Sequence, residues 1–64
     1  HRIPWEVQMK VGDLVRHKSP YARGYVGIVV RCIPGTDRVK VVEWTGAIRC
    51  SYPERDLEVI SESR

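Results

Sequence analysis

Several residue types are scarce in this sequence of 64 residues. It contains no phenylalanine, one methionine, two cysteines and two histidines. No apolar run approaches the roughly 20 residues that a membrane-spanning helix needs, so we expect no association with a membrane. The segment before Met9 lacks the apolar stretch of a secretory signal peptide, which leads us to expect a cytoplasmic protein.

The scarcity of histidine and cysteine also argues against catalytic and metal sites. A zinc site would have to combine Cys32, Cys50 and His17, and the sequence has no Cys-x-x-Cys pair. A catalytic unit built on histidine would depend on His17, because His1 is terminal. No glycine-rich phosphate loop precedes a predicted helix. We therefore expect no enzyme activity, no cofactor and no metal, and we interpret both cysteines as reduced thiols.

Basic residues are concentrated in the body of the chain. The net charge is +3 and the isoelectric point is near 9.2. From Lys10 to Arg49 there are eight Lys and Arg against three acids, whereas four acids stand against two arginines after Arg49. A basic body with an acidic end is compatible with a surface that binds a polyanion such as nucleic acid.

The spacing of apolar residues predicts strands almost throughout. No window shows the i, i+3, i+4, i+7 pattern of a helix, whereas alternating and continuous apolar runs recur. Proline, glycine and aspartate in "PGTD" (34–37) and the pair Thr45-Gly46 indicate two hairpin turns. "PERD" (53–56) indicates one short 3-10 turn before the last strand. The expected strands cover residues 14–16, 25–33, 38–44, 47–52 and 57–60.

This pattern predicts an all-β domain, a five-stranded SH3-like small barrel that is closed or nearly closed. We expect residues 9–61 to form the barrel and residues 62–64 to form a C-terminal tail. Residues 1–8 are interpreted as an N-terminal extension or an added sequence. Within "GYVGIVV" (24–30), Gly27 is expected at the point where the second strand bends, and Gly24 at a positive φ.

Two short segments resemble a known family. "VGDLVRHK" (11–18) and "GYVGIVV" (24–30) are similar to the KOW-type and related SH3-like small barrels of ribosomal proteins, transcription elongation factors and small phage proteins. In that family a Gly-Asp pair opens the first strand and a Gly-x-Val-Gly-x-Val segment forms the second. The resemblance extends through about fifty residues to "LEVI" (57–60), and it implies the fold more specifically than a partner.

A second resemblance is to a family of enzymes. "GDLVRHKS" (12–19) and "YPERDLEVI" (52–60) resemble segments of the plasmid-borne type II dihydrofolate reductases, in which four SH3-like chains surround one pore. The active-site residues of that family form a Val-Gln-Ile-Tyr stretch directly before the proline that corresponds to Pro53 here. This chain has Arg49-Cys50-Ser51-Tyr52 there and retains only the tyrosine, so the similarity implies kinship of fold without that catalysis.

Aromatic and basic residues near the predicted loops are the candidate binding residues. In SH3-like barrels such aromatic positions, here including Tyr25, often line a groove between the first long loop and the second hairpin. Aromatic rings stack on bases or pack against proline-rich peptides, and cations contact phosphates. Trp44 either closes one end of the barrel or points outward together with Lys40 and Val42. The candidate set is Arg16, Lys18, Tyr21, Arg23, Lys40, Trp44, Arg49 and Tyr52.

These observations predict a binding module that contacts nucleic acid through its basic loops, above all through the loop from Ser19 to Gly24. The alternatives are a module for protein interaction or assembly, which could be an oligomer, and an oligomeric reductase-like enzyme.

Overall fold

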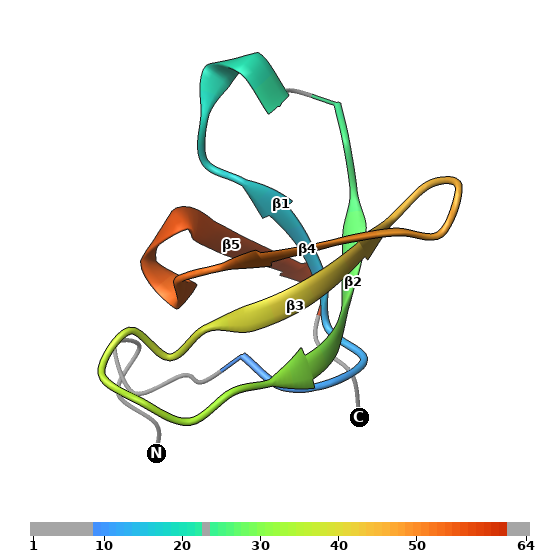
Figure 1. The fold of residues 1–64 in the computed structure, drawn as a ribbon. Coiled ribbons are helices and arrows are strands. Elements are labelled where there is room, and N and C mark those ends of the chain that lie inside the picture. The colour runs from blue at the N-terminus through green and yellow to red at the C-terminus, as the bar shows by residue number, and fades with distance from the viewer. Residues whose placement is uncertain (1–8, 23, 62–64) are drawn as a thin grey trace.

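A computed structural model describes residues 9–22 and 24–61 of the chain. The strands are β1 (Leu14–His17), β2 (Gly27–Cys32), β3 (Lys40–Trp44), β4 (Ile48–Tyr52) and β5 (Leu57–Ser61), and the 3-10 turns are η2 (Pro20–Ala22) and η3 (Glu54–Asp56). The predicted all-β class and the 3-10 turn before the last strand are confirmed (Figure 1). The turn η2, within the loop after β1, is an addition to the prediction. The described residues include no helix with the length and apolarity of a membrane span.

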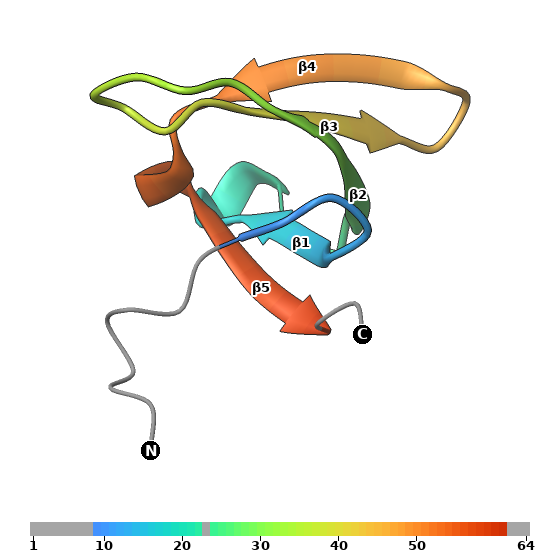
Figure 2. The ribbon, with the colours of Figure 1, turned by 90° about the horizontal axis from the view of Figure 1, so that it is seen from below.

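All five strands form one antiparallel sheet in the order β4-β3-β2-β1-β5. The expected closure into a barrel is not observed, because β4 and β5 do not pair with each other within the described residues. Pro53 and η3 lie between these two strands and redirect the chain, and β5 pairs with β1. Figure 2 shows the consequence: β3 and β4 lie over β1 and β5, and the curved β2 runs from one layer to the other.

Three strands are shorter than the sequence suggested: β2, β3 and, by one residue, β4. The backbone N–H of Tyr25 donates to the carbonyl of Ala22 at 3.2 Å, so Tyr25 belongs to a turn and β2 begins at Gly27. At the other end, the N–H of Ile33 donates to the carbonyl of Val39 at 2.8 Å, which closes the β2–β3 loop before β3 begins. A turn hydrogen bond therefore replaces strand pairing before β2, whereas the Ile33–Val39 bond continues the register in which Cys32 pairs with Lys40.

The Gly-Asp pair before β1 is held by the side chain of Asp13. This side chain is buried, and its Oδ2 accepts the backbone N–H of Lys10 at 3.0 Å. The carbonyl of Asp13 accepts the N–H of Val29 at 3.0 Å, and the N–H of Gly12 donates to the carbonyl of Val29 at 2.8 Å. The turn into β1 is thus attached to the middle of β2.

The core is small, as expected for a chain of this length. Its buried apolar side chains are Val15, Val29, Val42 and Leu57, and the partly buried side chains of Met9, Trp44, Tyr52 and Val59 pack against them. These residues come from every strand of the sheet. The two layers therefore meet over a single thin cluster.

Gly27 lies where a strand passes close to its neighbour. It is buried, and a Cβ atom built there would clash with Cγ1 of Val42 and would lie 2.8 Å from Cε3 of Trp44. The predicted positive φ of Gly24 is confirmed at 89°. A bulge between Val29 and Arg31 adds to the bend of β2.

The structure resolves which face of β3 is buried. Lys40 and Val42 are 4% and 0% exposed, and Trp44 packs against the core. The alternative in which these three residues point outward together is wrong. Lys40 can lie on the core face because its Nζ donates to the carbonyl of Arg38 at 2.7 Å, at the end of the strand.

Candidate functional site

An open groove with a volume of about 500 Å³ lies between the β1–β2 loop and the β3–β4 hairpin. We call it the aromatic groove. It brings together three of the predicted binding residues, Tyr21, Trp44 and Tyr52, and the position between these two loops agrees with the prediction. None of its described lining residues is Lys, Arg, Asp or Glu. The lining residues are His17, Ser19, Tyr21, Ala22, Tyr25, Trp44, Thr45, Ile48 and Tyr52.

Three rings form the fixed part of the aromatic groove. The ring centroids of Trp44 and Tyr52 are 6.0 Å apart with an interplanar angle of 81°, and those of His17 and Tyr52 are 5.0 Å apart at 64°. Both contacts are edge-to-face, an arrangement that the ring quadrupoles favour. The indole Nε1 of Trp44 donates to Oη of Tyr52 at 3.1 Å. The polar hydrogen of Trp44 is therefore already used within the protein.

Tyr52 occupies an apolar environment within this cluster. Burial is the main cause that raises the pKa of its phenol. A hydrogen bond with Cys50 raises the pKa further, whereas the hydrogen bond from Trp44 lowers it. Burial prevails, and Tyr52 keeps its proton to a higher pH than an ordinary tyrosine does.

The opposite side of the aromatic groove consists of exposed side chains from the segment between β1 and β2. Tyr21 is 96% exposed and Tyr25 is 64% exposed. The loop is held by Ser19, whose N–H donates to Nδ1 of His17 at 3.0 Å and whose Oγ accepts the N–H of Tyr21 at 3.2 Å. A rigid wall of rings thus faces tyrosines that are available for contact.

Most of the predicted cations lie away from the aromatic groove and are paired with carboxylates. Nε of Arg16 is 2.8 Å from Oε1 of Glu58, and this hydrogen bond, with the attraction between the two charges, raises the pKa of Arg16 and lowers that of Glu58. Nε of Arg49 lies 2.8 Å from Oε1 of Glu43. Both arginines are exposed, so each charge is already matched at the surface.

The remaining predicted cations differ from one another. Lys40 is buried, with its Nζ 3.6 Å from Oε2 of Glu54, and so it does not offer the accessible charge that the sequence suggested. Lys18 is exposed and forms no ion pair within residues 9–22 and 24–61. Arg23 lies outside the described residues.

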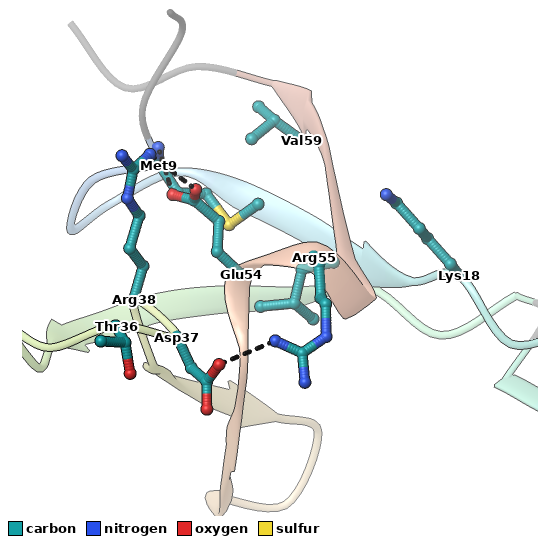
Figure 3. Close-up of a pocket in the computed structure, with 9 residues that line it drawn as sticks. Met9, Lys18, Thr36, Asp37, Arg38, Glu54, Arg55 and Val59 are labelled. Atoms are coloured by element: carbon teal, nitrogen blue, oxygen red, sulfur yellow. Dashed lines mark hydrogen bonds and ion pairs between the residues drawn. The ribbon is translucent and has the colours of Figure 1, made fainter. Parts of the chain in front are cut away.

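A second groove of about 430 Å³ lies beside η3 and the β2–β3 loop (Figure 3). Its charged groups are mostly paired internally. Nη1 of Arg55 is 2.9 Å from Oδ1 of Asp37, and Nη1 of Arg38 is 3.6 Å from Oε1 of Glu54. Figure 3 shows Glu54 directed toward Arg38 and Met9, while Lys18 stands apart at the edge. Because its cations and anions neutralise each other, this groove is the weaker candidate site.

Sequence reasoning missed three contributors to the aromatic groove. Ile48 is 59% exposed and shares one face of β4 with Tyr52, and the even spacing between them could have indicated this. His17 and Thr45 gave no comparable signal. His17 adjoins Tyr52 only because β1 and β4 lie in facing layers, which requires the tertiary fold.

The described residues contain no group of three or more His, Cys, Asp or Glu that could hold a metal ion. Comparison with protein-family models, curated proteins and solved structures gives no match for this chain.

Proposed function

We propose that this domain is a protein-interaction module that binds an extended peptide segment in the aromatic groove. The observation that carries the proposal is the lining of this groove, which combines tyrosine, tryptophan and isoleucine side chains with no Lys, Arg, Asp or Glu among the described residues. Grooves of aromatic rings on a rigid scaffold bind peptides by packing against their apolar side chains, and proline-rich segments are a common case.

The distribution of charge favours a peptide over nucleic acid. A phosphate backbone is bound by cations that are free to replace its counterions. Among the described residues, Lys18 and Arg31 are the cations without an ion pair. The other cations would have to leave their carboxylates, which lowers the net gain from each phosphate contact.

Nucleic-acid binding remains the second candidate because of one local arrangement. Lys18 and the 96% exposed Tyr21 lie on the same loop. A tyrosine ring can stack on a base while a nearby lysine contacts the adjoining phosphate. The basic residue Arg23 follows in the sequence.

A selection from a display library of short random peptides tests the first candidate. The Trp5→Phe variant serves as the parent, because Trp44 is then the sole tryptophan and its fluorescence reports on the groove. We expect enriched peptides to shift this fluorescence. Ile48→Lys, which puts a charge into the groove, should weaken their binding at least about tenfold. Ser51→Lys is the matched control, because Ser51 is exposed on the opposite face of β4.

The outcome separates the two candidates. If no enriched peptide binds Ile48→Lys more weakly than it binds Ser51→Lys, the groove is not a peptide site and the proposal fails. A labelled single-stranded oligonucleotide is titrated in parallel at about 50 and about 200 mM salt. Binding that weakens steeply with salt, and that the triple variant of Arg16, Lys18 and Arg23 to alanine abolishes, would support the nucleic-acid candidate.

A further inference from the structure

We infer that His17 positions one side of the aromatic groove, the loop segment from Ser19 to Ala22, and that it does so only while its imidazole ring is neutral. His17 is the last residue of β1, is half-buried and lines the groove. The control that this places on ligand binding rests on the proposed peptide function. The dependence of the loop on the ring concerns the free protein and does not rest on it.

The ring of His17 connects the two sides of the aromatic groove. On one side it lies edge-to-face against Tyr52, with the ring centroids 5.0 Å apart. On the other side its Nδ1 accepts the N–H of Ser19 at 3.0 Å. Ser19 holds the rest of the segment, because its Oγ accepts the N–H of Tyr21 at 3.2 Å and its carbonyl accepts that of Ala22 at 3.1 Å. The two sides of the groove therefore meet at one imidazole ring.

The hydrogen bond from Ser19 requires the neutral form of the ring. Nδ1 accepts an N–H through its lone pair, so the single hydrogen of the neutral ring lies on Nε2. An imidazolium ring carries a hydrogen on both nitrogens and has no acceptor. The added proton occupies the position toward which the N–H of Ser19 points. No rotation of the side chain restores the bond, because the ring carbons also carry hydrogens.

Protonation of His17 therefore changes the groove. Within the described residues, the N–H of Ser19 has no second acceptor. Either the ring turns away from Ser19 and leaves Tyr52, or the segment from Ser19 to Ala22 moves away from the ring. Both changes alter the surface that a ligand contacts, because the segment carries the 96% exposed Tyr21.

The charges around the ring do not hold its protonated form in place. His17 forms no ion pair with a carboxylate of the described residues. Glu58, which lines a small pocket together with His17, is already paired with Arg16 at 2.8 Å. The titratable and charged groups that flank the ring from β1, β4, β5, η3 and the loop are Arg16, Lys18, Tyr52, Asp56 and Glu58.

Peptide binding at two pH values tests the effect on the ligand. Histidine side chains ordinarily change charge between pH 5 and 8, and the apparent affinity falls with the fraction of protein in the binding-competent form. The probe is a peptide enriched on the Trp5→Phe parent, without His, Asp or Glu and with blocked ends. We expect its dissociation constant to be at least about tenfold higher at about pH 5 than at about pH 8.

Two variants of His17 separate the acceptor from the ring. His17→Asn supplies a side-chain oxygen that accepts the N–H two residues later, as in an Asx turn, and does not titrate. Its dissociation constant should be the same at both pH values, although His1 and the amino terminus still titrate. His17→Phe keeps a ring beside Tyr52 without an acceptor, so at about pH 8 it should bind as weakly as the parent does at about pH 5.

Nuclear magnetic resonance of the parent tests the structural part without a peptide. A scalar coupling between the Ser19 amide nitrogen and Nδ1 of His17 reports the N–H···N bond directly. We expect this coupling to disappear with the same midpoint as the titration of the His17 ring. The amide signal of Tyr21 should shift with that midpoint, and in His17→Asn it should not.

Three results would overturn the inference. One is a coupling that survives the titration of the ring, and another is the same loss of peptide binding at acid pH in His17→Asn. The third is a peptide that requires the groove, as Ile48→Lys shows, but has equal dissociation constants at both pH values. This third result would leave the proposed function standing. If no peptide is found, the proposed function fails, and the coupling measured in the free protein still decides the role of His17.

Discussion

Trp44 and Tyr52 fix each other's position across the β3–β4 pair: Nε1 of Trp44 donates to Oη of Tyr52 at 3.1 Å, and the two rings cross at 81°. Each residue also packs against the core. The inner wall of the aromatic groove is therefore part of the folded framework. A ligand bound in this groove would meet ring surfaces whose orientation is set before binding, which would reduce the entropy lost on association.

Replacement of Tyr52 by phenylalanine removes the acceptor of this hydrogen bond and keeps the ring. We expect the free energy of unfolding to fall by about 1 kcal/mol, the typical net value of a hydrogen bond in a protein. Urea denaturation measures the change. Tyr25→Phe is the control, because Tyr25 is 64% exposed and should change stability little. Equal effects of the two substitutions would mean that the Trp44 bond does not contribute to stability.

The raised pKa of Tyr52 predicts a loss of stability in alkaline solution. Burial favours the neutral phenol in the folded state, so its pKa there exceeds the unfolded value of about 10. The stabilisation is complete below the unfolded value and is lost as the pH rises through the folded value. Absorbance of tyrosinate should show a late-titrating phenol that is missing in Tyr52→Phe. A titration that this substitution leaves unchanged would contradict the assignment.

Replacement of Gly27 by valine should lower the free energy of unfolding by about 1–3 kcal/mol, the usual cost of overpacking. The new Cβ would clash with Val42 and Trp44, which lie in the core and in the groove wall. Gly24→Ala is the comparison, since a Cβ there has nothing within 4 Å and only the positive φ opposes it. A thermal melt of Gly27→Val that matches the parent would show that β3 can move aside.

The strands could be predicted from the sequence because they depend on local pattern, and the alternation of apolar residues placed β3 and β4. The position of the aromatic groove between two loops followed from the resemblance to SH3-like barrels and not from local pattern. The buried face of β3 could not be chosen, because Val39 and Val41 alternate with Lys40 and Val42 and both sets carry valine. Burial of Lys40 depends on the carbonyl of Arg38 and on the carboxylate of Glu54. Glu54 is distant in the sequence and lies near Lys40 only in the folded chain.

The ion pairs were beyond sequence reasoning for a related reason. Arg16 and Glu58 are 42 residues apart and meet because β5 pairs with β1. The sequence showed a basic body and an acidic end as separate regions. In the folded chain the two regions lie side by side. Carboxylates of the acidic end therefore neutralise much of the basic charge from which nucleic-acid binding was predicted.

The Arg16–Glu58 pair predicts that the free energy of unfolding depends on pH in the acidic range. The hydrogen bond and the charge of Arg16 lower the pKa of Glu58 below the unfolded value of about 4.3. The contribution is therefore present above that value and is lost as the pH falls through the folded pKa. Glu58→Gln should flatten the stability profile in this window, and high salt should reduce the difference because both groups are exposed. Parallel acid-unfolding curves of variant and parent would contradict this.

The buried ammonium of Lys40 predicts an asymmetry between two substitutions. Its Nζ has the carbonyl of Arg38 at 2.7 Å and Oε2 of Glu54 at 3.6 Å, and its side chain is 6% exposed. Glu54→Ala leaves this charge with one neutral acceptor, so we expect a loss of about 2–3 kcal/mol from the free energy of unfolding. Lys40→Met replaces the charge by an apolar side chain of similar length. Glu54 then keeps Nη1 of Arg38 at 3.6 Å and the N–H of Met9 at 3.4 Å, so the loss should be below about 1 kcal/mol.

Urea denaturation of both variants and of the double variant completes the cycle, in which Lys40→Met should recover most of the loss caused by Glu54→Ala. If Lys40→Met alone is as costly as Glu54→Ala, the ammonium stabilises the fold through more than its charge pair, and the expected asymmetry is wrong.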